Sequence, residues 1–202
     1  MKHFRILGFL LLSLAAPVAG CSVGGTDSMF TSAVAVREGT VDSAEAARLI
    51  SRYRQSHGLS GVTVDPTLTN IAATHSRRMA EANKMAHVLP GEGSFGQRLR
   101  VGGFSGGPAA ENVAAGQDSL AEVLESWRKS PGHNKNLLYP GVTQIGIALA
   151  IAPGTRYEKF WTLVLGGPRP PGAAIMSGPT AGPYVGIPTA NGAVLTIGGG
   201  LD

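Results

Sequence analysis

The sequence contains a single cysteine, Cys21, so a disulfide within the chain is excluded. It also has little excess of charge. The formal net charge is +4, and removal of an N-terminal segment carrying Lys2 and Arg5 would leave about +2. Proteins that bind nucleic acid usually gather Lys and Arg on one face, and this small excess does not predict such a face. We therefore expect no nucleic-acid partner.

The N-terminal apolar run, Ile6–Ala16, is too short to cross a bilayer, which takes about 20 apolar residues. Basic residues precede the run and small residues follow it, which is typical of a signal peptide. The sequence therefore predicts a signal peptide over residues 1–20.

Residues 18–21, Val-Ala-Gly-Cys, resemble the bacterial lipobox. That resemblance implies cleavage before Cys21, attachment of lipid to Cys21, and a small, polar tether over residues 21–41. Ser22 is compatible with sorting to an outer membrane, so we expect a lipid-anchored protein of the bacterial cell envelope. The alternative is ordinary secretion with cleavage near Ala19 and no role for Cys21.

Several catalytic motifs are absent or lack their context. There is no H-E-x-x-H zinc helix. GEGSFG (residues 91–96) matches a dinucleotide-binding loop, but a predicted helix precedes it where that loop needs a strand. GFSGG (residues 103–107) matches a nucleophile elbow but has no strand before it and Pro108 after it. We interpret both as glycine-rich loops.

Two helices are predicted early in the chain. The first follows Asp42, with Glu45 placed for a capping box, and ends at Gly58. The second begins after Asp65 and continues to the Pro90-Gly91 stop. Its apolar stripe consists of Leu68, Ile71, Ala72, His75, Met79, Ala82 and Met85. Because His75 lies in that stripe, it is predicted to be a histidine at the edge of the core.

A short helical piece is predicted around Phe95–Arg100, and a third helix from an Asp118 cap to Pro131. Two β-rich runs, 143–153 and 158–167, are predicted to form a hairpin. Helices come first and strands last, which favours an α+β fold. A Gly/Pro-rich extension follows over residues 167–202, with a late strand near its Asn-Gly turn signal.

Three ionisable residues lie at the ends of predicted elements, where side chains from distant segments can meet. His87 is expected to close the second helix, Glu111 lies in the small-residue segment AAENVAAG, and His133 follows the Pro-Gly pair after the third helix. They could hold a zinc-like cation with one open position, or form a hydrogen-bonded cluster in which Glu111 orients a histidine. The third possibility is that they are three unrelated surface or capping residues.

Four segments together resemble the CAP superfamily of cysteine-rich secretory proteins, antigen-5 allergens and plant pathogenesis-related proteins, in its bacterial branch. They are MAHVLPGEGSFGQRL, AENVAAG, VLESWRKSPGHNKNLLYPGVTQIGIALA and FWTLVLG. The matching motif residues are His87, Glu111, Asn112, Trp127, Ser130, Gly132, His133, Asn136 and Gly146. The resemblance covers about residues 45–166. It implies an α–β–α sandwich with a small antiparallel sheet and a central cleft, with the CAP domain over residues 42–166.

The resemblance also implies a site. Many members line the cleft with two histidines and two glutamates that can hold a divalent cation such as zinc. His87, Glu111 and His133 match this set, but Ser130 stands where the second glutamate would be. We expect no catalytic residue, because no nucleophile is evident. The favoured function is non-enzymatic binding of a partner or a small apolar or lipid-like ligand; the alternative is a metal-assisted peptide or ester hydrolase.

Overall fold

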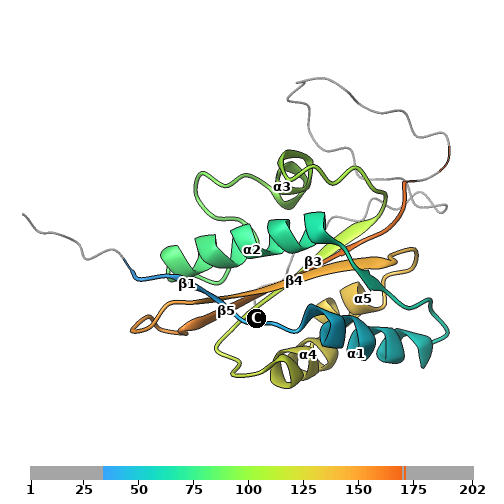
Figure 1. Cartoon of the computed structure of the whole chain (residues 1–202), viewed down its shortest axis with the longest axis horizontal. Coiled ribbons are helices and arrows are strands. Elements are labelled where there is room, and N and C mark those ends of the chain that lie inside the picture. The colour runs from blue at the N-terminus through green and yellow to red at the C-terminus, as the bar shows by residue number, and fades with distance from the viewer. Residues whose placement is uncertain (1–33, 170, 172–202) are drawn as a thin grey trace, which may run out of the picture. The chain divides into compact units, whose positions relative to one another are not determined.

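The computed structural model describes residues 34–169 and 171 (Figure 1). Its elements, in chain order, are β1 (Arg37–Gly39), α1 (Ser43–Gln55), β2 (Thr63–Val64), α2 (Pro66–Glu81), α3 (Phe95–Val101), β3 (Ala109–Ala115), α4 (Leu120–Lys129), α5 (Pro131–Leu137), β4 (Gln144–Ile151) and β5 (Lys159–Gly166). None of these helices has the length and apolar character needed to span a membrane. The predicted signal peptide, Cys21 and the late strand lie outside the described residues.

The strands form one sheet in the order β1-β4-β5-β3, and β2 pairs in parallel with β4. The predicted hairpin is confirmed, since β4 and β5 pair antiparallel with Ile147 opposite Leu163. β3 pairs antiparallel with β5 and ends the sheet. Contacts of the sheet extend past the predicted domain limits of 42 and 166 on both sides. β1 pairs with β4, and Gly167 exchanges backbone hydrogen bonds with Gly107 and Pro108.

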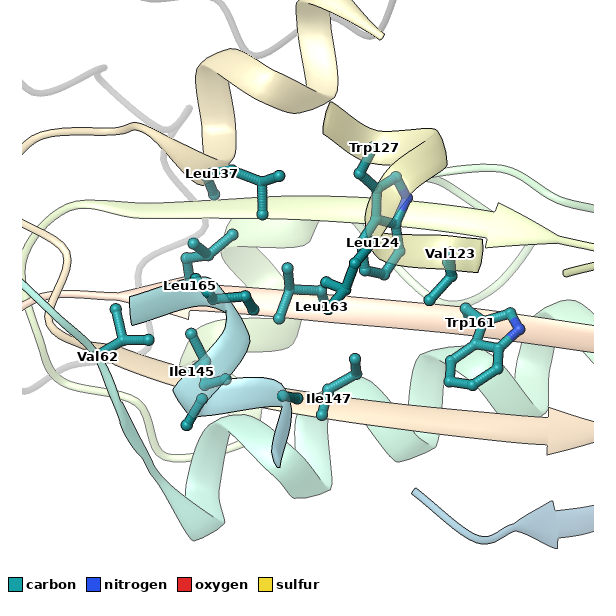
Figure 2. Close-up of a cluster of buried hydrophobic side chains, with 14 of the residues drawn as sticks. Val62, Val123, Leu124, Trp127, Leu137, Ile145, Ile147, Trp161, Leu163 and Leu165 are labelled. Atoms are coloured by element: carbon teal, nitrogen blue, oxygen red, sulfur yellow. The ribbon is translucent and has the colours of Figure 1, made fainter. Parts of the chain in front are cut away.

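Helices cover both faces of the sheet (Figure 1). Because strand side chains alternate between faces, each strand contributes to two cores. On the side of α1, α4 and α5 the core holds large side chains, which Figure 2 shows gathered between strands and helices: Val62, Val123, Leu124, Trp127, Leu137, Ile145, Ile147, Trp161, Leu163 and Leu165. On the side of α2 and α3, β4 instead presents Ala148 and Ala150. The predicted three-layer α–β–α sandwich is confirmed.

Small residues on β4 allow α2 to lie very close to the sheet. A Cβ added to Gly146 would come within 2.0 Å of the Leu68 carbonyl carbon and 2.1 Å of the Thr69 nitrogen. No side chain fits in that space, since non-bonded carbon atoms prefer a separation of about 3.5–4.0 Å. Gly146 therefore permits the contact between backbones that sets the depth of the α2 layer.

The predicted end of the second helix is wrong. α2 ends at Glu81, so neither Met85 nor His87 is helical. Asn83 adopts a left-handed conformation with φ of 46°, which asparagine tolerates better than most residues. Its side-chain oxygen accepts a hydrogen bond from the backbone of Arg156, 73 residues away in the β4–β5 connection. A tertiary contact thus holds the turn well before the Pro90-Gly91 pair.

Four elements were not predicted, namely the short strands β1 and β2, strand β3 and helix α5, and one cap was misplaced. Pro131 does follow the third helix, which ends at Lys129, but it also occupies the first turn of a new helix, α5. The Ala-rich segment around Glu111 is strand β3. Ser119, one residue after the predicted Asp118, caps α4. The predicted caps Asp42 and Asp65 are confirmed.

Candidate functional site

Glu111 is the centre of a buried polar cluster on the α2 and α3 side of the sheet. It shares strand parity with Val113, which packs with Met79 of α2, and its side chain is 1% exposed. Arg98 of α3 holds it through two bonds, Nη1 to Oε2 at 2.7 Å and Nη2 to Oε1 at 3.0 Å. His87 Nδ1 lies 2.9 Å from the same Oε1. Both carboxylate oxygens therefore accept hydrogen bonds from the protein itself.

These contacts keep Glu111 charged. Burial by itself would raise the pKa of the Glu111 carboxyl group. The hydrogen bonds from His87 and Arg98, together with the positive charges of His75 and Arg98, outweigh burial and lower the pKa below its usual value. Glu111 is thus an ionised acceptor and cannot serve as a proton donor near neutral pH.

Arg98 is placed by a short, well-capped helix. The Ser94 side chain accepts from the Gln97 backbone and the Gln97 side chain accepts from the Ser94 backbone, which completes a capping box at the start of α3. The Arg98 guanidinium also donates to the His87 carbonyl oxygen at 2.9 Å. One side chain therefore restrains both the carboxylate of the cluster and the loop that carries His87.

The hydrogen bond to Glu111 selects one tautomer of His87. An ionised carboxylate only accepts, so Nδ1 of His87 carries the proton and, in the neutral ring, Nε2 carries the lone pair. The His87 side chain is 34% exposed, which places it at the boundary between the cluster and solvent. His87 is therefore an oriented imidazole whose Nε2 forms no hydrogen bond with a carboxylate of the described residues.

His133 lies near this pair but does not join it by hydrogen bonds. Its backbone oxygen accepts from Asn112 at 3.1 Å, and its side chain is half-buried. Burial lowers the pKa of His133, and the charge on His87 lowers it further. Among residues 34–169 and 171, neither His87 nor Glu111 forms a hydrogen bond with the His133 ring. Of the three predicted residues, His87 and Glu111 are joined by a hydrogen bond, and His133 interacts with His87 through charge.

Sequence reasoning missed half of the cluster. His75 is fully buried rather than at the core edge, with Nδ1 2.7 Å from Glu92 Oε1 and Nε2 3.0 Å from the Ala86 carbonyl oxygen. Its Nε2 also lies 3.9 Å from Glu111 Oε1. Glu92 belongs to the GEGSFG segment, which the sequence predicts to be a glycine-rich loop with no role in the site. The sequence did contain a signal for these partners: His75 is the single ionisable residue in the apolar stripe of α2, and a buried histidine needs polar partners.

The motif running from Trp127 to Asn136 binds the open edge of the sheet. Outer carbonyls of an edge strand need partners from elsewhere. Trp127 Nε1 donates to the Val113 oxygen at 3.2 Å, and Asn136 Nδ2 donates to the Glu111 oxygen at 3.0 Å and to Asn112 Oδ1 at 2.9 Å. Asn136 thereby attaches α5 to β3.

The predicted three-residue metal site does not fit this arrangement. Within the part of the chain that the structure describes, no group of three or more His, Cys, Asp or Glu is placed to hold a metal ion. Glu111 has both oxygens engaged, and a carboxylate behind a histidine orients the ring rather than coordinating. Only the rings of His87 and His133 remain as donors, so cation binding stays a prediction with a reduced ligand set.

Comparison with known proteins gives consistent matches. The chain is 33% identical over 116 residues to the uncharacterized protein YkwD of Bacillus subtilis, covering 57% of this chain and 45% of that protein. An extracellular protein with an SCP domain from Bacillus anthracis matches at 30% identity and a TM-score of 0.54, over 61% of this chain and 39% of the other. An outer surface protein of Borrelia burgdorferi shares the fold, with 21% identity, a TM-score of 0.56, and coverage of 66% and 100%.

The chain spans less than half the length of the curated relatives that it matches. The model of the Cysteine-rich secretory protein family matches residues 47–165, which run from within α1 into β5. More than half of the sequence lies in that match, so this chain belongs to the CAP family.

Proposed function

We propose that this protein is an extracytoplasmic, lipid-anchored CAP domain that binds a small apolar or lipid-like ligand without turning it over. The observation that carries the proposal is a groove of about 190 Å³ between α1 and α4, on the opposite face of the sheet from Glu111. Its lining residues are Leu49, Ile50, Tyr53, Ala121, Leu124, Glu125, Arg128 and Leu137. Binding sites for small molecules are typically apolar with a few polar groups, as this lining is.

The groove has a charged end that matches an amphipathic ligand. The Arg128 guanidinium lies 4.5 Å from the centre of the Tyr53 ring and 3.4 Å from Glu125. A cavity of about 150 Å³ is enough to hold a benzene ring in an apolar core, so this groove suits a chain segment or a small ring. An apolar chain with an anionic end would place its chain against the leucines and its charge at Arg128.

A substitution that fills the groove tests whether the ligand binds there. In Ala121→Trp, an indole on exposed helix surface would occupy the space while the core residues stay in place. We expect dodecanoate binding, measured by titration calorimetry, to weaken at least tenfold. Ala44→Trp is the matched control, because Ala44 lines a separate hollow beside β2. Equal binding by wild type and Ala121→Trp, or absence of binding by wild type, contradicts the proposal.

The extracytoplasmic location and the anchor rest on separate support. One relative is described as extracellular and a structural neighbour as an outer surface protein. The signal peptide and Cys21 provide the route, with the membrane as a partner through the lipid. Cys21→Ser should move the protein from the membrane fraction to the soluble fraction. If the variant stayed with the membrane, a different anchor would be needed.

The non-enzymatic assignment rests on the absence of an activated nucleophile. No hydroxyl or thiol in residues 34–169 and 171 forms a hydrogen bond with His87 or His133, and Ser130 makes no side-chain cap. One observation favours the alternative hydrolase: the bond between His87 and Glu111 is the base and orienting group that such an enzyme would use. A panel of peptides and esters, with and without zinc, decides between them. Hydrolysis that disappears in His87→Ala and His133→Ala would establish the enzyme.

A further inference from the structure

We propose that Arg98 is the resident cation of the Glu111 site: it compensates the buried carboxylate where a metal ion would otherwise be needed, and it fixes the position of His87. This inference goes beyond the proposed ligand binding. It concerns the α2 and α3 face, whereas the groove lies between α1 and α4, so each can fail without the other.

The first support is that the Glu111 carboxylate is the acceptor in each hydrogen bond of its side chain. Arg98 donates to both oxygens in the paired geometry that guanidinium and carboxylate groups prefer. His87 adds a third bond at Oε1. Three of the acceptor positions of Glu111 are thus taken, and a metal ion bound through Glu111 would have to share Oε2 with the Arg98 guanidinium.

The second support is the balance of charge. The Ala86 carbonyl only accepts, so His75 Nε2 is protonated; Nδ1 faces a Glu92 oxygen, so another proton lies between those two groups. The His75–Glu92 pair is then neutral, as is the Arg98–Glu111 pair. Addition of a divalent cation would leave this buried region with two uncompensated positive charges, which is unfavourable at low dielectric.

The third support is the burial of Arg98. Its side chain is 6% exposed, and the other nearby carboxylate is Glu92, whose Oε1 lies 3.9 Å from Arg98 Nε and is paired with His75. Glu92 Oε2 accepts no hydrogen bond from the described residues, so a guanidinium displaced from Glu111 would have Glu92 as its remaining partner. A metal ion at Glu111 would therefore require Arg98 to change partners inside a buried cluster, with loss of both bonds to Glu111.

The role of Arg98 is one of positioning, exercised through Glu111 and the His87 carbonyl. Glu111 receives the Nδ1 proton of His87, and Arg98 holds both the carboxylate and the backbone of the loop. Because the carboxylate stays ionised and oriented, His87 keeps its Nε2 lone pair toward the open side. Arg98 thus sets the chemical form in which His87 is presented.

Zinc titration of the full chain tests the inference. Arg98→Met removes both Arg98 bonds to Glu111 and leaves Oε2 without a donor, so we expect zinc chloride to bind at least tenfold more tightly than to wild type in calorimetry. Arg98→Met/Glu111→Leu should lose that gain. Arg100→Met is the matched control, because Arg100 lies on the same helix and is exposed. Zinc affinity that is equal in wild type and Arg98→Met overturns the proposal.

A second measurement covers the case in which Arg98→Met fails to fold. In wild type and in Arg98→Lys, which keeps the charge, the ¹⁵N resonances of the His87 ring should show the Nδ1–H tautomer at pH 7.5. If Arg98 only stabilised the fold, either tautomer of the His87 ring would be compatible with its role. An Nε2–H tautomer in wild type would overturn the inference, whatever the stability of the variants.

Discussion

Two arginines are buried in this domain, on opposite faces of the sheet, and their charges are compensated in different ways. Arg54 of α1 is fully buried and donates to four backbone carbonyl oxygens, those of Ser60, Leu137, Tyr139 and Val142, at 2.8–3.1 Å. No carboxylate pairs with it in the described residues. Arg98 instead pairs with Glu111 and lies beside Glu92. A buried guanidinium can thus be satisfied by neutral dipoles or by a full countercharge.

The difference between the two arginines follows from what each one joins. Arg54 gathers carbonyls at the end of α5 and in the loop after it, where the helix dipole favours a positive charge. It ties α1 to the helix that carries His133 and Asn136. Burial lowers the pKa of Arg54, yet the group stays protonated because guanidinium loses its proton only far above neutral pH. Arg54 is structural, whereas Arg98 determines the electrostatics of a site.

The largest expected effect is loss of Arg98 alone. Arg98→Met leaves Glu111 buried without its countercharge, and breaking such a pair costs about 3–5 kcal/mol of unfolding free energy. Arg98→Met/Glu111→Leu should recover most of that loss, because neither charge remains. Urea unfolding of wild type and the variants gives the comparison. Equal losses in the single and double variants would show that side-chain packing, not charge, accounts for the effect.

Loss of Arg54 should cost less. Arg54→Met leaves carbonyl groups without donors but no isolated charge, and a buried unsatisfied polar group costs about 1–3 kcal/mol. We expect a loss of about 2–3 kcal/mol in urea unfolding. Arg52→Met, two residues away and exposed, should change stability by less than about 0.5 kcal/mol. A loss for Arg54→Met as large as that for Arg98→Met would remove the distinction between dipole and charge compensation.

The hydrogen bonds from Asn136 to β3 should contribute an intermediate amount to the free energy of unfolding. Asn136→Ala removes the donor to the Glu111 carbonyl and to Asn112, at a cost of about 1–3 kcal/mol. The exposed neighbour Lys135 supplies the control, Lys135→Ala. Hydrogen exchange of the β3 amides should rise in Asn136→Ala before exchange in β4 does, since β3 lies at an edge of the sheet and β4 lies inside it. Unchanged exchange in β3 would show that the Asn136 hydrogen bonds do not stabilise this strand.

The smallest effect is expected in the dependence of stability on pH. The folded pKa of His133 is lowered, so below the unfolded value of about 6.5 the unfolded chain binds more protons and stability falls as pH falls. Its contribution is fully present above that value. Glu111 adds a second decline below about 4.3, because its folded pKa is lowered too.

Urea midpoints at pH 8, 6, 5 and 4 measure these two declines. His133→Asn should flatten the change between pH 8 and 5 and leave the decline below pH 5 in place. A wild-type midpoint that stays constant from pH 8 to 5 would show that His133 has no lowered pKa in the folded state.

Much of the fold and part of the site follow from local sequence signals. Asp42 and Asp65 cap α1 and α2 as expected, because capping depends on residues within one turn. The hairpin of β4 and β5 follows from two apolar runs and a short connection. Family resemblance identified His87, Glu111 and His133 as neighbours, although spacing alone left their relationship open.

Short-range patterns were thus enough to predict the starts of α1 and α2, the hairpin of β4 and β5, the α+β class and the family. Long-range packing was needed to show that Arg98 compensates Glu111 and that His75 pairs with Glu92. It also decided where α2 ends, since a contact with Arg156 holds Asn83 in its turn. The physical reason is that ion pairs and edge-strand hydrogen bonds join residues distant in the chain, and no local preference encodes which partners will meet.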